Sequence, residues 1–270
     1  MTSLQKVKHV VLDMDGTIYL GKRLFPQTLP FLAGLAEFGV GYSFLTNNCS
    51  RSRAEYVAHL REIGLNAPIE AIQTSAQATA HYIHSKLPEV RRLFVLGTDG
   101  LDEDLRTAGF EVVADAPDAV VVGFDTGLHY EALCQTAYWI SRGLPYVATH
   151  PDRICPTDRA TVLPDCAAIC ALLEMATGRR PEAIPGKPSP AMLHAVCAKY
   201  GLAADEVALV GDRLYTDIRM ARDAGAVAVL TLTGEAKREQ VDECPAAQQP
   251  TIIVNHLGEL AELIRDAHRS

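Results

Sequence analysis

The sequence has few of the features that mark several classes of protein. It contains no run of 18 apolar residues, the length that crosses a bilayer, and its first residues carry no apolar segment typical of a signal peptide. Lys plus Arg number 25 against 33 Asp plus Glu, a net charge of −8, which argues against DNA or RNA as the main partner. We therefore expect a cytoplasmic protein that neither spans a membrane nor binds nucleic acid.

Cysteine is present without the spacing of a metal site. The seven cysteines include no CxxC pair, and Cys166 and Cys170, four residues apart, have no second pair to complete a zinc site. This pattern favours buried thiols in a reducing compartment. With 270 residues, 48% of them hydrophobic, the chain is long enough for one large domain or two modest ones.

Short apolar runs alternate along the chain with amphipathic stretches. The runs are continuous rather than alternating, which indicates strands buried on both faces of a parallel sheet. The expected strands are Val10–Leu12, Tyr42–Leu45, Leu93–Leu96, Ala119–Val122, Tyr146–Ala148, Val207–Val210, Ala226–Leu230 and Ile252–Val254. The expected helices are 53–63, 76–86, 166–176, 191–200 and 256–267.

This alternation of strands and helices predicts an α/β fold with a doubly wound, mainly parallel, Rossmann-like core sheet. Two stretches, Gln73–Ser75 and Gly178–Gly186, have the composition of linkers and enclose about a hundred residues with their own alternation of strands and helices. We expect a smaller α/β domain inserted into the core. The expected boundaries are 1–77 for the first part of the core, 78–183 for the insertion and 184–270 for the second part.

The first chemical signal follows the first apolar strand. Asp13 and Asp15 stand two residues apart at its end, and Gly16 comes next. Ligands bind outside the carboxyl ends of strands in open α/β sheets, and two buried carboxylates imply a cation or a shared proton. A glycine lets the backbone approach an anion closely. The alternative interpretation is a simple turn that ends a strand.

Three further signals occupy similar places. Thr46 and Asn47 follow a strand and could donate hydrogen bonds to phosphate, although helix capping is the more ordinary interpretation of this motif alone. Lys187 lies between prolines just before a helix, where it would attract an anion or simply occupy an exposed turn. Asp212 ends another buried strand, and Asp217 follows five residues later; such oxygens suit magnesium, and Asp217 could orient rather than bind.

The order of these four signals resembles that of the haloacid dehalogenase superfamily of phosphotransferases. The residues that match its pattern are Asp13, Asp15, Thr46, Lys187, Asp212 and Asp217. The segments 12–21 and 210–218 are similar to those of the p-nitrophenylphosphatase or NagD-like branch, whose members carry a large α/β cap domain between the Thr and Lys motifs. The resemblance covers the whole chain and implies a phosphatase that hydrolyses a small phosphorylated metabolite.

The resemblance also implies a role for each matching residue. Asp13 would be the nucleophile and form an aspartyl-phosphate, and Asp15 would act as acid and base. Mg2+ would be held by Asp13, by the main-chain carbonyl of Asp15 and by Asp212.

Other residues would bind the phosphate group. Thr46 and the amides of Asn47 and Gly16 would hold its oxygens, Lys187 would neutralise its charge, and Asp217 would support the site from behind.

The cap would select the leaving group. Asp125, Tyr130, His150 and Asp152 are our candidates for specificity, and the branch more often has Asn where this chain has His150. Branch members often form homodimers through the cap.

Two other kinds of function stay open on the sequence alone. The chain could be a regulatory protein that stores phosphate on Asp13, or a scaffold without turnover. It could also catalyse a related phosphotransfer such as a phosphomutase reaction.

Overall fold

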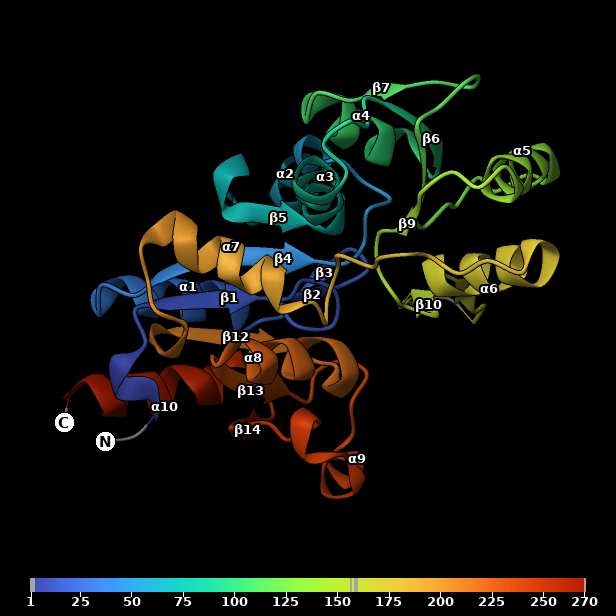
Figure 1. The fold of residues 1–270 in the computed structure, drawn as a ribbon. Coiled ribbons are helices and arrows are strands. Elements are labelled where there is room, and N and C mark those ends of the chain that lie inside the picture. Colours follow the sequence, from blue (N-terminus) through green and yellow to red (C-terminus); the bar gives the residue numbers. More distant parts are fainter. Residues whose placement is uncertain (1–2, 156, 158–159, 270) are drawn as a thin grey trace. The chain divides into compact units, whose positions relative to one another are not determined.

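The computed structural model of the protein describes residues 3–155, 157 and 160–269 (Figure 1). The chain forms two compact units. The first comprises the chain up to Thr46, Leu60–Ile72 and the chain from Lys187 onward, and the second comprises Asn47–His59 and Gln73–Gly186. The second unit therefore includes residues 47–59, which lie outside the expected insertion. The domain division expected from the sequence stays a prediction.

The first unit contains a six-stranded sheet with the strand order β14-β13-β12-β1-β4-β5. Its strands are β1 (His9–Leu12), β4 (Gly41–Thr46), β5 (Ile72–Thr74), β12 (Val207–Gly211), β13 (Val227–Thr231) and β14 (Ile252–Val254). β1 pairs in parallel with both β12 and β4, and the valine-rich strands β1, β12 and β13 are buried along their whole length. The carboxyl ends of β12, β1 and β4 therefore meet at one edge of the sheet.

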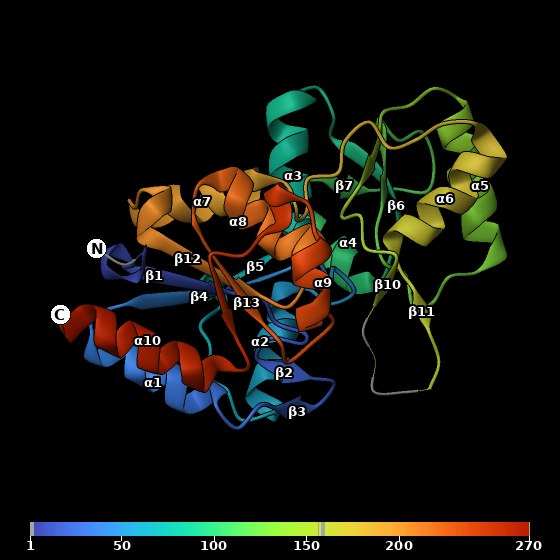
Figure 2. The same ribbon diagram turned by 90° about the horizontal axis from the view of Figure 1, so that it is seen from below.

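Helices cover both faces of this sheet. Figures 1 and 2 show α1 (Thr28–Glu37) and α10 (Leu257–Arg269) on one face, and α7 (Pro190–Tyr200) and α8 (Arg219–Ala224) on the other. α7 has Pro190 at its first position and ends at Gly201, whose φ is 65°. These start and stop signals could be recognised in the sequence. This unit also contains the hairpin β2 (Tyr19–Leu20) and β3 (Arg23–Leu24), α9 (Arg238–Glu243) and a short helical turn at Leu214–Ile218.

The second unit has its own parallel sheet, in the order β7-β6-β8-β9. Its strands are β6 (Arg92–Leu96), β7 (Glu111–Val112), β8 (Ala119–Val122) and β9 (Tyr146–Ala148). Its helices are α3 (Ser75–Lys86), α4 (Asp99–Thr107), α5 (Tyr130–Ser141) and α6 (Cys166–Thr177); α2 (Arg53–Glu62) begins in this unit, and β10 (Ile154–Cys155) pairs with β11 (Leu163–Pro164).

Alternate residues of β8 supply two apolar layers. Ala119 and Val121 pack against α3 and α4, whereas Val120 and Val122 pack against α5 and α6. A strand with apolar residues at every position is stable only between two layers of helices, which explains the continuous apolar runs in the sequence.

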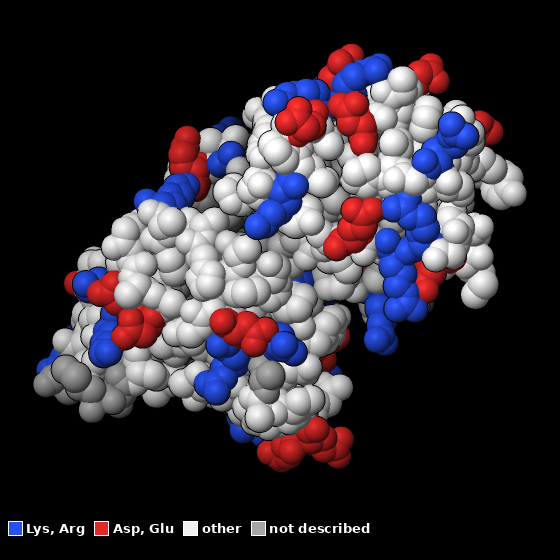
Figure 3. All heavy atoms as spheres, in the orientation of Figure 1, with Lys and Arg blue, Asp and Glu red and all other residues white. Residues whose placement is uncertain are grey.

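The doubly wound α/β fold expected from the sequence is confirmed, and each expected strand and helix is present. Several elements were not expected, among them β5, the two short hairpins, α1, α4 and α5. Within the described part of the chain, no helix is both long enough and apolar enough to cross a membrane. Acidic and basic side chains are interspersed on the face shown in Figure 3.

Candidate active site

Four charged side chains form a buried cluster at the carboxyl edge of the core sheet. Asp13 directly follows β1 and Asp212 directly follows β12, so the parallel pairing of these strands places the two aspartates side by side. The Asp13, Asp212 and Asp217 carboxylates each offer an oxygen within 4.8 Å of the others. Lys187 joins them, and all four residues are at most 6% exposed. The sequence placed these residues in different motifs, and the fold brings them together.

Lys187 is held by two carboxylates. Its Nζ donates to Oδ1 of Asp13 and to Oδ1 of Asp217, the latter at 2.7 Å. Burial acts to lower the pKa of Lys187, but these two carboxylates raise it above its usual value, so the side chain is an ammonium ion. Lys187 is therefore not an exposed turn lysine, and its charge is fixed beside Asp13.

Asp13 is itself shifted by its surroundings. Burial raises its pKa to about 6 against the opposing charge of Lys187. Its second oxygen, Oδ2, accepts a hydrogen bond from the hydroxyl of Thr17 at 3.3 Å. Both contacts orient one carboxylate at the end of a rigid buried strand, which is the arrangement that a nucleophilic aspartate requires.

Asp212 has an oxygen without a protein partner. Its Oδ2 accepts the backbone N–H of Glu235 at 2.8 Å, but its buried Oδ1 has no hydrogen-bond partner among the described residues. Burial, and then the charges of Asp13 and Asp217, raise the pKa of Asp212 well above its usual value. A buried acceptor beside excess negative charge is stabilised by a cation. These hard oxygen donors fit Mg2+.

Asp217 is occupied differently. One of its oxygens accepts from Lys187, and the other accepts the backbone N–H of Arg213 at 3.2 Å. A Cβ at Gly211 would collide with the Asp217 side chain, so a glycine is required at the end of β12. These contacts favour Asp217 as a residue that holds Lys187, whereas the buried carboxylate oxygen without a protein partner belongs to Asp212.

Asp15 and Gly16 form the turn after β1. Asp15 is partly exposed, and its Oδ2 accepts a hydrogen bond from the Tyr19 hydroxyl at 3.1 Å. The Gly16 N–H donates to the Tyr19 carbonyl at 2.8 Å, so in this structure it is not free for a phosphate oxygen, in contrast to the role expected from the sequence. Gly16 has φ 86°, and a Cβ there would collide with the Asp212 carboxylate. The absence of a side chain at Gly16 therefore leaves room for the Asp212 carboxylate.

The loop after β13 also supports the site, although no motif in the sequence pointed to it. Thr233 Oγ1 donates to the carbonyl of Gly16 at 2.6 Å, and a Cβ at Gly234 would overlap the Asp212 carboxylate. The neighbouring Glu235 contributes the N–H that holds Asp212. The signal that could have found this loop is a Thr-Gly pair soon after a buried strand.

The four cap candidates lie in different surroundings. Asp125 lines a pocket, and Tyr130, at the start of α5, is 81% exposed. His150 and Asp152 are buried, and both ring nitrogens of His150 are hydrogen-bonded within the protein, so it does not face a ligand in this structure. Asn47 belongs to the same surroundings, since its Nδ2 donates to Oδ1 of Asp152 at 3.2 Å.

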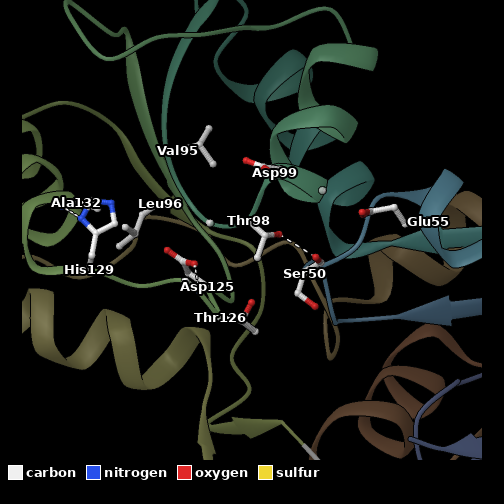
Figure 4. A pocket seen from close by; sticks show the side chains of 13 residues that line it. Ser50, Glu55, Val95, Leu96, Thr98, Asp99, Asp125, Thr126, His129 and Ala132 are labelled. Atoms are coloured by element: carbon white, nitrogen blue, oxygen red, sulfur yellow. Dashed lines mark hydrogen bonds between the residues drawn. The ribbon is translucent and has the colours of Figure 1, made fainter. Parts of the chain in front are cut away.

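The pocket that contains Asp125 has a volume of about 560 Å³ and lies at the carboxyl ends of β6 and β8 (Figure 4). Its lining includes the carboxylates of Glu55, Asp99 and Asp125 and no Lys or Arg among the described residues. Burial, with added repulsion from Asp99 and Asp125, raises the pKa of nearby Asp102 to about 6. Among the described residues this lining has no cation comparable to Lys187 of the core cluster, which favours the core cluster as the phosphate site.

The comparisons with known proteins agree with this geometry. A model of the haloacid dehalogenase-like hydrolase family matches residues 10–111, and a second, HAD-hydrolase-like model matches residues 184–260. The ribonucleotide monophosphatase NagD of Escherichia coli K12 is 31% identical over 239 residues, which cover 88% of this chain and 93% of that protein. The chain thus belongs to the haloacid dehalogenase-like hydrolase family.

Solved structures extend the likeness to nearly the whole chain. A 4-nitrophenylphosphatase from Thermotoga maritima superposes with a TM-score of 0.92 at 38% identity, covering 98% of this chain and 100% of that one. A glycerol phosphate phosphatase from Mycobacterium tuberculosis, in complex with magnesium, gives a TM-score of 0.88 at 32% identity, with 98% and 80% covered.

Proposed function

We propose that this protein is a magnesium-dependent phosphatase that hydrolyses a small phosphomonoester through an aspartyl-phosphate on Asp13. The observation that carries the proposal is the buried pair of Asp13 and Lys187 beside the unpartnered oxygen of Asp212. It combines a fixed carboxylate nucleophile, a fixed positive charge and an incomplete ligand set for a cation. The phosphatase names of the similar proteins support the same reaction.

Mg2+ would be held by the carboxylates of Asp13 and Asp212 together with the main-chain carbonyl of Asp15. Three carboxylates and one ammonium leave this cluster with excess negative charge, and the free oxygen of Asp212 is available to a ligand. When bound, the ion would offset the negative charge of the phosphate and of the site. The magnesium complex of the related glycerol phosphate phosphatase supports this choice of metal.

The chain's own residues supply the two chemical steps. A carboxylate oxygen of Asp13 attacks phosphorus, the bond to the leaving oxygen breaks, and Asp15 gives that oxygen its proton. Asp15 then takes a proton from the water that attacks the aspartyl-phosphate, which releases inorganic phosphate and restores Asp13. Asp15 is partly exposed, so it can exchange protons with solvent between steps.

Thr46, the Asn47 amide and Lys187 would bind the phosphate oxygens. Thr46 is the last residue of β4, the strand next to β1, and is buried near the end of that strand. Lys187 lies against the nucleophile, so it neutralises charge where the phosphoryl group must approach. Positioned charges of this kind supply most of the acceleration in phosphoryl transfer.

The test is steady-state release of phosphate from p-nitrophenyl phosphate with and without a chelator. We expect many turnovers per enzyme, loss of activity on chelation and recovery with Mg2+. A single stoichiometric phosphorylation without further release would instead identify a regulatory phospho-acceptor. Release that continues at full rate in the chelator would contradict the assigned metal.

The substrate is expected to be a small phosphorylated metabolite. The similar proteins named above act, by their names, on ribonucleoside monophosphates, glycerol phosphate and 4-nitrophenyl phosphate. A phosphate-release screen over sugar phosphates, nucleoside monophosphates and glycerol phosphate would rank these classes by kcat/KM.

We further infer a cytoplasmic homodimer that forms through the cap. All seven cysteines are free, which suits a reducing compartment. Helices α5 and α6 carry exposed apolar side chains, among them Tyr138 (55%), Leu172 (48%) and Met175 (89%). Light scattering of the purified protein and of Met175→Glu tests this; a monomer at all concentrations would refute the dimer.

A further inference from the structure

The residues that we assign to phosphate lie next to two points where the chain passes between the compact units. The chain leaves the first unit after Thr46, rejoins it over Leu60–Ile72, and returns to it for the last time at Lys187. Asn47 and Gly186 are the residues of the second unit that are bonded directly to Thr46 and Lys187, and we call them the passage residues. Whatever fixes these two residues also limits the backbone positions of Thr46 and Lys187, to which they are covalently joined.

Both passage residues are held by the segment 149–152 that follows β9. Asn47 is 3% exposed, and its Nδ2 donates to Oδ1 of Asp152 at 3.2 Å. The N–H of Gly186 donates to the carbonyl of Thr149 at 2.9 Å. A Cβ at Gly186 would lie 2.8 Å from Oδ1 of Asn47 and 2.9 Å from Cβ of His150, so both passage residues pack closely against each other and against this segment.

His150 anchors this segment to a helix. It is completely buried, with Nδ1 2.8 Å from the hydroxyl of Thr149 and Nε2 2.9 Å from Oδ1 of Asp165. Asp165 is the N-cap of α6, and the same oxygen accepts the N–H of Cys166 at 2.6 Å. The imidazole therefore connects the segment to the start of a twelve-residue helix.

The charge state strengthens this connection. Burial acts to lower the pKa of His150, but the Cys166 sulfur and the Asp165 carboxylate raise it well above its usual value. A protonated ring donates from both nitrogens, and a hydrogen bond to a carboxylate is about twice as strong as a neutral one. Both nitrogens already have partners, so the ring is not available to a substrate.

We propose that His150 is a positioning residue for phosphate binding: by fixing the segment 149–152 it holds the Asn47 and Gly186 peptides, and through them the phosphate ligands Thr46 and Lys187. The inference rests on the proposed phosphatase function. It replaces direct substrate contact, which we expected of His150 from the sequence, with an indirect role. A small displacement of groups that bind a reacting phosphate is costly, because the geometry must be accurate to a fraction of an ångström.

The test compares His150→Leu with His150→Asn and with Leu173→Ala in the full-length protein. Leu removes both ring hydrogen bonds, whereas the Asn amide can still donate to Asp165. Leu173 is completely buried in α6 and packs in the apolar layer of the same unit. Its truncation therefore destabilises the unit without removing a contact of the two passage residues. Thr149→Val, which removes only the hydroxyl partner, serves if His150→Leu does not fold.

Two measurements are made: the affinity for orthophosphate by calorimetry with Mg2+, and KM and kcat for p-nitrophenyl phosphate. We expect His150→Leu to weaken phosphate binding and raise KM about tenfold, the size of one charged hydrogen bond lost at the phosphate. The fall in kcat should be smaller than the rise in KM. His150→Asn should recover most of the loss, and Leu173→Ala should leave phosphate affinity within about twofold despite its lower melting temperature.

Three outcomes would overturn the inference. One is unchanged phosphate affinity in His150→Leu, or in Thr149→Val where that variant replaces it. Another is an equal loss in Leu173→Ala at matched stability, which would make the effect one of stability alone. The third is a stoichiometric transition metal that disappears with His150, because His150, Asp152 and Asp165 present ligand atoms within 4.8 Å of one another. Absence of turnover in the wild type would refute the proposed function, but phosphate affinity could still be measured.

Discussion

The two ends of strand β1 each bury a titratable side chain, with opposite results. At the amino end, His9 is 4% exposed, stacks on Tyr200 with ring centroids 4.2 Å apart, and its Nε2 lies 2.9 Å from the hydroxyl of Ser43. A Cβ at Gly41 would lie 2.7 Å from its Nδ1. Burial, with the charge of Lys199, lowers the pKa of His9 to about 4, so the ring is neutral and closely packed.

At the carboxyl end, Asp13 keeps a charged partner in Lys187 and lies beside the unpartnered oxygen of Asp212. At the amino end, burial therefore leaves His9 neutral. At the carboxyl end, the carboxylates are only partly neutralised by Lys187. Buried charge at the carboxyl end of a parallel strand indicates a site where a bound ligand compensates that charge.

Replacing the nucleophile should have the largest effect. Asp13→Asn is expected to reduce the turnover of p-nitrophenyl phosphate by about 10⁴-fold or more, because no carboxylate remains to form the intermediate. Circular dichroism should show an unchanged fold. The matched control is Asp205→Asn, an exposed aspartate paired with Lys6, which should keep full activity. Substantial turnover by the Asp13 variant would exclude its role as nucleophile.

Removing the fixed cation comes next. Lys187→Met should lower kcat/KM by about 10²- to 10³-fold, since the charge that faces the phosphoryl group is lost. It should also reduce the free energy of unfolding by about 3–5 kcal/mol, because Asp13 and Asp217 lose their common partner. Lys199→Met, an exposed lysine bonded to the carbonyl of Glu70, provides the comparison. A near-neutral kcat/KM at Lys187 would refute its role in phosphate binding.

Metal binding should stabilise the carboxyl end. At a hundredfold excess of Mg2+ over its Kd, the free energy of unfolding should rise by about 3 kcal/mol, measured by thermal denaturation with and without a chelator. Asp212→Asn should abolish this rise, whereas Asp217→Asn should keep part of it, because Asp217 is occupied by Lys187 and by the N–H of Arg213. The reverse order would make Asp217 the ligand.

The amino end should show a smaller effect that depends only on pH. The pKa of His9 is about 4 in the folded state and near 6.5 when unfolded, so below pH 6.5 the unfolded chain binds a proton that the folded chain does not. Stability should therefore fall by about 2 kcal/mol from pH 7 to pH 5 on account of this residue. Urea denaturation of the wild type and of His9→Gln at both pH values gives the difference. Equal pH dependence in the two proteins would show that His9 is not responsible.

The folded elements could largely be read from local pattern. The valine-rich runs that became β1, β8, β12 and β13 are apolar at every position because helices cover both faces of each sheet. The element β5, Ile72–Thr74, was not expected because only one of its three residues is apolar, whereas the equally short β9 and β14 are continuous apolar runs.

The site was predictable in its members but not in its contacts. Asp13 and Asp212 could be found because each directly follows a buried strand. The roles of Gly16 and Gly234 beside the Asp212 carboxylate depend on packing between segments that are distant in the sequence, nearly 200 residues for Gly16, which no local pattern records. The same holds for His150, whose burial separates it from any direct contact with a substrate in this structure.

Local properties of the sequence, namely its hydrophobic period and the residues at strand ends, were enough to predict the doubly wound fold, the order of the four motifs and the chemical types at the active site. Which of the charged side chains have a charged partner depends on the tertiary structure. Lys187 lies 174 residues from Asp13 in the chain, and only the folding of both into one sheet edge fixes an ammonium against that carboxylate. Burial then sets the pKa of each group, since it depends on neighbours and solvent access that the chain acquires only when folded.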